Sequence, residues 1–562
     1  MTAAVRTAAM RTSAGRTAAV RTAASLAVVE GRLLARSALV LGGLVAGAVV
    51  VYRFGLGQGQ PLWWNAGWGI GYGQQILALA VLAAAQLAAG RARRDGLSEL
   101  YRSFPAAPRT RVLAQLAGLA GAVPASLVLI GAAVVTIDLR GAVGRPGLAA
   151  LAAGLLLVIA AGAAGIAVGT RFAHPLAGVL AAFVLLVPFS QSNRFNDPFI
   201  WLFPWVAPNQ LSWLPGPLAG YPPAAAHAVM LAGLAALAGL VALALTGGRR
   251  RLRAGLAVAA AAAAAVIGVA GAVQLRPIPA ADLTRLAAGV ASPATVQHCT
   301  TASQVRYCLY PGFGEELPAL QAPVRGVLAE LPRRPASPLT IRQTASLNFT
   351  DPTLTHGHPA ALRARWNREL AHGAGTVSSA SAIYLTAGTW PAGASRPARF
   401  SLALATAEWA VGLPPTAGIV DGSFSAQCVP LGQAREAVAI WLAIRATGAP
   451  AAQLRAGGLT VADIGGRPVL TWFYPGEGAG YLTSLGPQPT DAGYLLAQAM
   501  TRLPAARVSR VLDGAWSTWL SWHTSQARLA AALGIALPRP PAVRGLPPSL
   551  PAPNPVCDPG QP

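Results

Sequence analysis

The first half of the chain contains long apolar windows without charged side chains. A helix needs about 20 apolar residues to cross a bilayer, and an Arg at the centre of such a helix costs roughly 2.5–3.5 kcal/mol on insertion scales. The alternative, a soluble protein, would need seven buried helices in succession. We therefore predict a polytopic α-helical membrane domain with spans at 36–54, 73–90, 112–136, 147–169, 173–190, 223–246 and 254–275.

Charged residues divide the chain into two halves. Residues 1–275 hold 21 Arg and five acids, whereas residues 276–562 hold 22 Arg and 14 acids. The net charge is +24, but the Arg residues are scattered between apolar stretches, which does not favour nucleic-acid binding.

The chain has no Lys. Because a P-loop uses its Lys to reach the β- and γ-phosphates, the chain is not itself an ATPase of that class.

The distribution of Arg predicts the orientation of the spans. With the N-terminus in the cytoplasm and seven spans, 17 Arg lie in inner segments and four in outer segments. This arrangement predicts a protein of a cytoplasmic membrane whose C-terminal half lies outside. The seventh span, 254–275, decides that side, and its apolar signal rests on Ala, which is only marginally apolar.

The cysteines favour the same side. All four, Cys299, Cys308, Cys428 and Cys557, lie in the C-terminal half. An even number confined to one region suits an oxidising compartment and disulfides. Cys299 and Cys308 are close enough to close a hairpin, which leaves Cys428 to pair with Cys557; free buried thiols are the alternative.

Composition predicts five segments along the chain. Arg-Thr pairs recur every five residues near the N-terminus, a period that matches neither helix nor strand. Leu26, Val29 and Leu33 then share one face of a helix that leads into the first span. The expected segments are a disordered basic tail, the membrane domain, a Pro-containing linker, an extracytoplasmic domain and a Pro-rich tail, at 1–24, 25–275, 276–280, 281–537 and 538–562.

The C-terminal half mixes strand and helix patterns, which predicts a mixed α/β or α+β domain. Strand patterns occupy 305–310, 381–385 and 469–474. Helical patterns occupy 316–331, 359–371, 398–411, 431–446, 490–503 and 505–521.

The most specific motif is the cytoplasmic loop 91–111, RARRDGLSELYRSFPAAPRTR. Leu97, Leu100, Tyr101 and Phe104 recur at helical spacing, and Asp95 can cap the start of that helix. The loop therefore predicts a two-turn amphipathic helix flanked by Arg. A loop that simply rests on lipid headgroups is the alternative.

This loop, with an N-terminal interfacial helix and six spans, resembles the permease subunits of bacterial ABC exporters, the six-span type-two class common in actinobacteria. The resemblance covers about residues 25–250, and the chain departs from it in its seventh span and its C-terminal region. It implies that the loop is a coupling helix that docks on a separate P-loop ATPase, which binds the ATP, and that two permeases pair as a homodimer or heterodimer. The positions that match are Arg94, Asp95, Glu99, Leu100, Arg102 and Phe104.

The C-terminal half contains no H-E-x-x-H or G-x-S-x-G motif. His356 and His358, with His372 further on, are weak candidates for holding a metal. Glu408 lies on an apolar helical face, where a buried paired carboxylate is commoner than a catalytic acid. We expect no enzymatic activity, no resident metal and no cofactor in this chain.

The resemblance thus implies a permease subunit of an ABC transporter of the exporter type, coupled through loop 91–111 to a separate ATPase. A membrane-anchored extracytoplasmic binding or sensor protein is the second hypothesis. A membrane-bound hydrolase that uses the His residues or Glu408 is the third.

Overall fold

The protein is described by a computed structural model that divides into two compact units, one built on residues 61–283 and one on residues 364–562. Shorter segments complete each unit, and the two units are described separately. The structure describes residues 20–52, 63–97, 99, 107–138, 147–184, 202, 223–247, 250–344, 355, 357–376, 382–386, 396–413, 433–448, 459–464, 467–472, 491–521 and 523–537.

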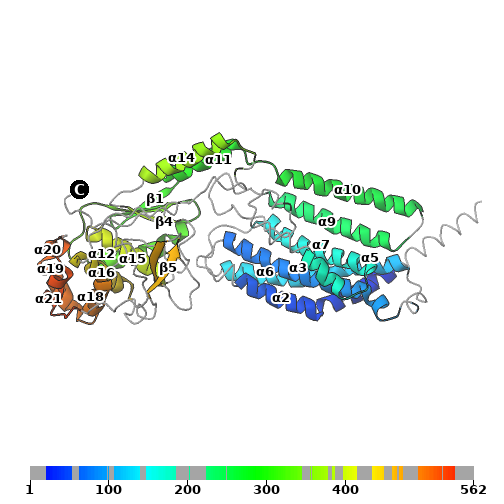
Figure 1. Ribbon diagram of the computed structural model, residues 1–562, viewed down its shortest axis with the longest axis horizontal. Helices are drawn as coiled ribbons and strands as arrows, with labels where there is room; N and C mark the ends of the chain where they lie inside the picture. The colour runs from blue at the N-terminus through cyan, green and yellow to red at the C-terminus, as the bar shows by residue number, and fades with distance from the viewer. Residues whose placement is uncertain are drawn as a thin grey trace, which may run out of the picture. The chain divides into compact units, whose positions relative to one another are not determined.

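The first unit is a bundle of long helices (Figure 1). Its first helix, Val20–Ala35, begins within the predicted tail, so residues 20–24 are helical. The helices that follow are α2 (Ala38–Val50), α3 (Trp63–Arg94), α5 (Pro108–Gly118), η2 (Leu119–Ala122), α6 (Val123–Asp138), α7 (Leu148–Arg171), a helix at 176–184, α9 (Ala224–Leu245) and α10 (Arg250–Gln274).

Most of the predicted spans are present as helices that could cross a membrane. In the described residues, five are long and apolar enough: Gly69–Arg94, Pro108–Ile137, Leu148–Arg171, Ala224–Leu245 and Leu252–Gln274. Val20–Ala35 and Ala38–Val50, bent by 51°, form a sixth candidate as a broken span. Of the predicted span 173–190, the described part contains the helix 176–184.

The outer surface of the bundle is apolar. Large side chains such as Val45, Val258 and Val269 are 65%, 72% and 66% exposed. A soluble protein rarely presents a contiguous apolar surface of this kind, whereas lipid tails solvate it. These exposed side chains indicate a membrane protein independently of helix length.

The third span contains a break that the sequence analysis did not anticipate. The 3-10 turn η2 separates α5 from α6, and Pro124 follows it, which has no N–H to continue the ladder. Gly121 packs directly on the backbone of Gly31, where an added Cβ would clash with the Gly31 carbonyl oxygen. The break therefore lies where the first helix approaches most closely.

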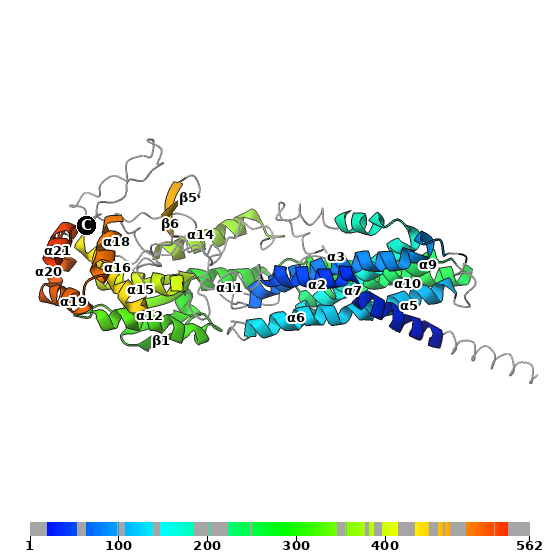
Figure 2. The same ribbon diagram turned by 90° about the horizontal axis from the view of Figure 1, so that it is seen from below.

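Small residues also set the contact between α3 and α7, which lie side by side in both views (Figures 1 and 2). A Cβ added to Gly165 of α7 would lie 3.0 Å from the carbonyl carbon of Leu82 and closer still to its oxygen. Close backbone approach through small residues is typical of helices that associate in lipid.

The second unit contains a four-stranded sheet in the order β1-β2-β3-β4, with strands β1 (His298–Ala302), β2 (Val305–Leu309), β3 (Leu339–Thr344) and β4 (Ala382–Thr386). The β1–β2 pair is antiparallel, whereas β2, β3 and β4 are parallel. Helix α12 (Leu317–Glu330) connects β2 to β3, and α14 (Ala360–Thr376) precedes β4. Buried side chains alternate along β3, and Leu339 and Ile341 lie on its buried face.

The rest of this unit is mainly helical. Helix α16 (Ala434–Thr447) is its centre, and eight successive residues from Ala437 to Ile444 are buried. Around it lie α15 (Arg396–Ala410) and α18 (Asp491–Thr501), followed in the chain by α19 (Ala505–Gly514), α20 (Trp516–Leu520) and α21 (Gln526–Leu533). Helix α11 (Ala280–Ala291) precedes β1, and β5 (Leu459–Ile464) and β6 (Arg467–Trp472) form an antiparallel pair.

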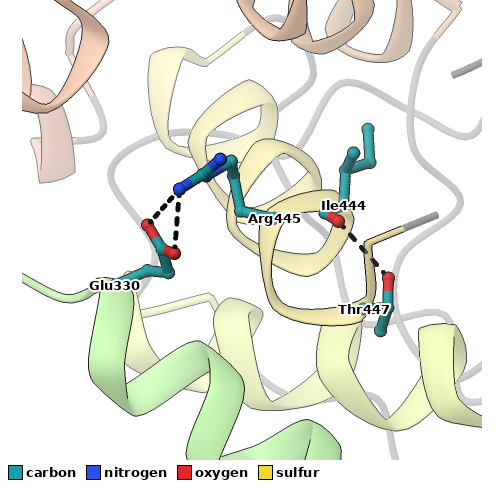
Figure 3. Close-up of polar contacts among 4 residues, drawn as sticks. All are labelled: Glu330, Ile444, Arg445 and Thr447. Carbon is teal, nitrogen blue, oxygen red and sulfur yellow. Dashed lines mark hydrogen bonds and ion pairs between the residues drawn. The ribbon is translucent and has the colours of Figure 1, made fainter. Parts of the chain in front are cut away.

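An ion pair joins α12 to α16, which pack against each other (Figure 3). Arg445 donates to both carboxylate oxygens of Glu330, at 3.1 and 3.5 Å. Nearby, the Thr447 hydroxyl donates to the carbonyl of Ile444 at 3.5 Å. Because both partners of the ion pair are partly exposed, it contributes at most about 1 kcal/mol.

The prediction of a mixed domain is confirmed, with differences in detail. The six helical patterns match described helices, but the pattern at 505–521 is two helices, because Ala515 leaves helical geometry. The three strand patterns match β2, β4 and β6. Strands β1, β3 and β5 were not predicted, and neither were helices α11 and α21.

Candidate functional site

The predicted coupling loop is described at its two ends. Helix α3 ends at Arg94, and the amides of Asp95 and Gly96 donate to the carbonyls of Arg91 and Arg93. Gly96 has a φ of +69°, a conformation that suits Gly after a helix. The Asp95 carboxylate lies 3.3 Å from Arg94 Nε. Among the matched positions, Glu99 is helical and exposed, and Leu100, Arg102 and Phe104 lie outside the described residues.

Two Arg side chains hold this loop to other helices. On its N-terminal side, Arg93 donates to the carbonyls of Gly169, at 2.6 Å, and Arg171, at 3.3 Å. On its C-terminal side, Arg109 donates to the carbonyl of Gly247. These carbonyls lie at the C-terminal ends of α7 and α9, where a cation is stabilised by the helix dipole. The loop is therefore fastened at both sides to helices distant in sequence.

These contacts gather many Arg residues at one end of the bundle. The ends of α3, α7 and α9 meet there with the start of α5, and α10 begins three residues after Gly247. The described Arg residues of these termini are Arg91, Arg93, Arg94, Arg109, Arg111, Arg171, Arg250 and Arg253. We call this set the basic end. It corresponds to the segments that the sequence analysis assigned to the cytoplasm.

Buried polar side chains connect helices inside the bundle. The hydroxyl of Ser126 donates to Gln74 Oε1 at 2.8 Å, and Gln74 returns a bond to the Ser126 carbonyl. His227 Nδ1 and Gln274 Oε1 lie 2.8 Å apart between α9 and α10. The sequence predictions did not include these amides, although Gln74 and Gln274 both lie in apolar windows.

Gln86 extends this polar interior towards the basic end. Its Nε2 donates to the carbonyls of His174 and Phe172, at 3.0 and 3.4 Å, and so ties α3 to the turn after α7. Its Oε1 is buried and has no partner among the described residues.

The pairing of Cys299 with Cys308 is confirmed. The two residues lie directly opposite each other on the β1–β2 hairpin and form a disulfide. Ser303 and Gln304, at the two-residue turn, both have positive φ, as tight hairpin turns require. The predicted partners Cys428 and Cys557 lie outside the described residues.

The histidine candidates for a metal are not brought together in the described residues. His358 Nε2 lies 2.7 Å from the Ile278 carbonyl. His356 and the side chain of His372 lie outside the description. Within the described part, no group of three or more His, Cys, Asp or Glu gathers in a way that could hold a metal ion.

Glu408 is buried on the apolar face of α15, as its pattern indicated. Its side chain is 3% exposed, and Oε2 has no partner among the described residues. Burial, and then the charge of Glu436, raise the pKa of Glu408 well above its usual range. Glu436 accepts a hydrogen bond from Gln526 Nε2 at 2.9 Å. Glu408 is thus a buried carboxyl of the helical core that feels the charge of Glu436.

A second buried acid lies at the carboxyl end of the parallel strands, and the sequence analysis missed it. Glu316 precedes α12, and its Oε2 accepts from Gln343 Nε2 at 3.2 Å. Gln343 Oε1 in turn accepts from the Tyr310 amide at 2.9 Å, and Gln297 donates to the Gln343 carbonyl. Burial raises the pKa of Glu316 to about 8. This network, Gln297–Tyr310–Glu316–Gln343, is the strand-end cluster.

The signal for this cluster was weak in the sequence. Glu315 and Glu316 are adjacent, and only the fold shows that one is exposed and the other buried. Gln343 is the penultimate residue of β3, a strand that had not been predicted.

Comparison of the chain with models of protein families, with curated proteins and with solved structures finds no match, so the family is not identified by similarity.

Proposed function

We propose that this chain is a membrane-embedded permease subunit of an ABC-type exporter, driven by a separate P-loop ATPase that docks at the basic end. The observation that carries the proposal is the attachment of loop 91–111 to two other helices, through Arg93 and Arg109. A loop that only rests on lipid headgroups does not need hydrogen bonds to other helices, whereas a loop that transmits movement to those helices does need them.

The contacts provide a route for that movement. A displacement of the loop acts directly on α3 and α5, which it joins. Through Arg93 it acts on the end of α7, and through Arg109 on the end of α9. Charge-assisted bonds to carbonyls are among the stronger hydrogen bonds. Four helices therefore respond together when the ATPase moves the loop, as opening of a path between two permease copies requires.

The resemblance assigns roles within the loop. Leu100 and Phe104 would be apolar anchors in a groove of the ATPase, and Glu99 and Arg102 would form polar contacts at its rim. Truncation of a buried anchor at an interface commonly costs over 1 kcal/mol. The positive charge of the basic end also suits a cytoplasmic position.

We further propose that the second unit lies outside the cell. The disulfide Cys299–Cys308 supports this side, because disulfides persist in oxidising compartments. Helix α10 supports it as well, since its Leu252–Gln274 segment is apolar enough to be a further span.

The test uses a double variant of the loop, Phe104→Ala with Glu99→Arg, and purification in mild detergent. We expect the ATPase to be lost from the purified complex. The matched control is Phe172→Ala, which removes an exposed aromatic ring at the same end of the bundle, outside the loop. If the ATPase remains bound to the double variant as it does to the control, docking through this loop is wrong.

The strand-end cluster favours a second candidate function, a membrane-anchored extracytoplasmic binding or sensor protein. Ligands of open α/β sheets bind outside the carboxyl ends of parallel strands, where Glu316 and Gln343 lie. Under this alternative, loop 91–111 tolerates charge reversal, and substitutions in the second unit abolish function. Growth or transport phenotypes of the two sets of variants distinguish the candidates.

A further inference from the structure

The first strand of the four-stranded sheet, β1, is an exposed edge strand. It is outermost in the order β1-β2-β3-β4, and its residues His298–Thr301 are exposed. Outside the ladder with β2, no backbone hydrogen bond to residues 298–302 is present in the described part of the chain. An edge strand with unpaired N–H and C=O groups is a template for pairing with another strand.

The register of the β1–β2 hairpin shows which groups point outward. Opposite residues of an antiparallel pair alternate between hydrogen-bonded pairs and closer non-hydrogen-bonded pairs, with Cα atoms about 5.5 and 4.5 Å apart. Cys299 and Cys308 lie opposite each other with Cα atoms 4.1 Å apart, so they are a pair of the second kind. The N–H and C=O of Cys299, and those of Thr301 two residues later, therefore point away from β2. The disulfide holds this edge in place, so that less ordering is needed when a partner strand binds.

The edge lacks the features that usually protect an edge strand. Proteins discourage pairing at an edge with charged side chains, Pro, a β-bulge or a covering segment. The strand HCTTA contains no Lys, Arg, Asp, Glu or Pro, and its register with β2 has no bulge. Thr300 and Thr301 are β-branched, which favours a strand. The edge is therefore suited to pairing with a further strand.

The charge of the edge indicates a second copy of this chain as the partner. The whole chain carries a net charge of +24, so an unrelated partner recognised by charge would be acidic, and β1 offers it no Arg. A second β1 brings an edge with the same lack of charged residues, so no like charges lie directly opposite each other. Each second unit follows the candidate span α10 in the chain, so two copies in one membrane present β1 on the same side.

We propose that two copies of this chain pair through β1 as antiparallel strands, related by a two-fold axis at Thr300. Thr300 then lies opposite its own counterpart, and Cys299 lies opposite Thr301 of the partner copy. Every outward N–H of these two residues finds a C=O, which makes four hydrogen bonds across the axis. The two Thr300 side chains form a favourable cross-strand pair. An interface with two-fold symmetry closes the assembly at two copies.

The membrane strengthens this contact. Pairing of two five-residue strands is weak by itself, but linking two binding events raises the overall affinity by about 10²–10⁴. The proposal rests on the proposed function in one respect, because a path between two permease copies requires that two copies pair within the membrane. It adds where their second units meet.

The test is a photo-crosslink mapped by mass spectrometry. The photoreactive residue p-benzoylphenylalanine replaces Val296, which is 41% exposed and precedes β1, in one of two differently tagged full-length copies. With the axis at Thr300, position 296 lies beside Gln304 of the partner copy. Within one copy, Gln304 lies at the other end of β1, and the register continues from position 296 to Pro311. We expect a covalent dimer with both tags, joined between position 296 and Gln304 or its neighbours.

Charge at the axis tests the register. Thr300→Lys places like charges directly opposite each other, and we expect it to reduce the crosslink about 10-fold or more; Thr300→Glu should do the same. When a Thr300→Lys copy is produced together with a Thr300→Glu copy, opposite charges meet, and the crosslink between the two should return. The control is Ser517→Lys, at an exposed hydroxyl residue of α20, which should crosslink as the natural chain does.

Three results would overturn the proposal. They are no dimer crosslink from position 296 in the otherwise natural chain, crosslinks that map only near Pro311 of the same copy, and a crosslink that Thr300→Lys leaves unchanged. The same membranes are assayed for a co-purifying P-loop ATPase, which tells the two proposals apart. An ATPase without the crosslink overturns pairing through β1 and leaves the transport function in place. The crosslink without an ATPase supports pairing through β1 and counts against transport.

Discussion

The contact between α3 and α7 gives a quantitative test of how the bundle is packed. In Gly165→Ala, the new Cβ would lie 3.0 Å from the carbonyl carbon of Leu82, whereas carbon atoms pack best at about 3.5–4.0 Å. The obstructing atoms belong to the backbone of α3, so no rotamer change relieves the clash. The helices must therefore separate by roughly 0.5 Å or more at this point.

The energetic cost of Gly165→Ala follows from the dispersion energy that is lost where the two helices separate. A buried Leu makes about 40–60 atom contacts of about 0.1–0.2 kcal/mol each, and a gap of 0.5–1 Å forfeits a quarter to a half of each contact that crosses it. For Leu82 and its buried neighbours, this amounts to about 1–3 kcal/mol, the usual range for overpacking. Replacing Gly by Ala in a helix returns up to about 1 kcal/mol. We expect Gly165→Ala to lower the free energy of unfolding by about 1–2 kcal/mol.

The assay is the fraction of protein that stays folded and monodisperse in detergent through a temperature series, followed by helical circular dichroism. The control is Gly131→Ala in α6, where an added Cβ meets nothing within 4 Å. It should be as stable as the natural protein or slightly more so. If Gly165→Ala unfolds at the same temperature as Gly131→Ala, the close approach of α3 and α7 is wrong.

Three further predictions concern the second unit. The folded unit holds a proton on Glu408 that the unfolded chain releases above about pH 4.3, so the free energy of unfolding falls as the pH rises above that value. The variant Glu408→Gln should make this fall shallower and raise the unfolding temperature at pH 7. A steeper fall of the unfolding free energy in the variant would contradict the prediction. Replacing Cys299 and Cys308 by Ser should cost about 3 kcal/mol, the value for a closed loop of about ten residues, and the natural protein should resist thiol alkylation at both positions until it is reduced. Arg445→Ala should change the unfolding free energy by less than about 1 kcal/mol, because its ion pair with Glu330 is partly exposed; a loss of several kcal/mol would show that the pair matters more.

The membrane helices could be predicted because their signal is local. Charge-free windows have no other ready explanation, and α7, α9 and α10 lie where those windows lie. The hairpin disulfide could also be predicted, since Cys308 is only nine positions after Cys299 and a short turn brings the two together. The burial of Glu408 followed from the apolar face on which it lies.

What could not be predicted depends on long-range contacts. The close approach of Gly121 to Gly31 at the break in the third span joins residues ninety positions apart. The attachment of Arg109 to the end of α9 joins residues 138 positions apart, and no periodicity encodes it. The strand-end cluster needs the pairing of β2 with β3, which places Gln343 beside Glu316. Such sites become visible only when the topology is known.

The most direct test of the central claim is the composition of the complex that this protein forms in its native membrane. The protein is purified in mild detergent with its loop 91–111 intact, and its partners are identified and quantified by mass spectrometry. The account predicts a P-loop ATPase in stoichiometric amount, lost when the loop carries Phe104→Ala with Glu99→Arg. A purified protein with no ATPase, whose Cys299–Cys308 disulfide is nevertheless intact, would contradict the transport function and leave the second unit as the functional part.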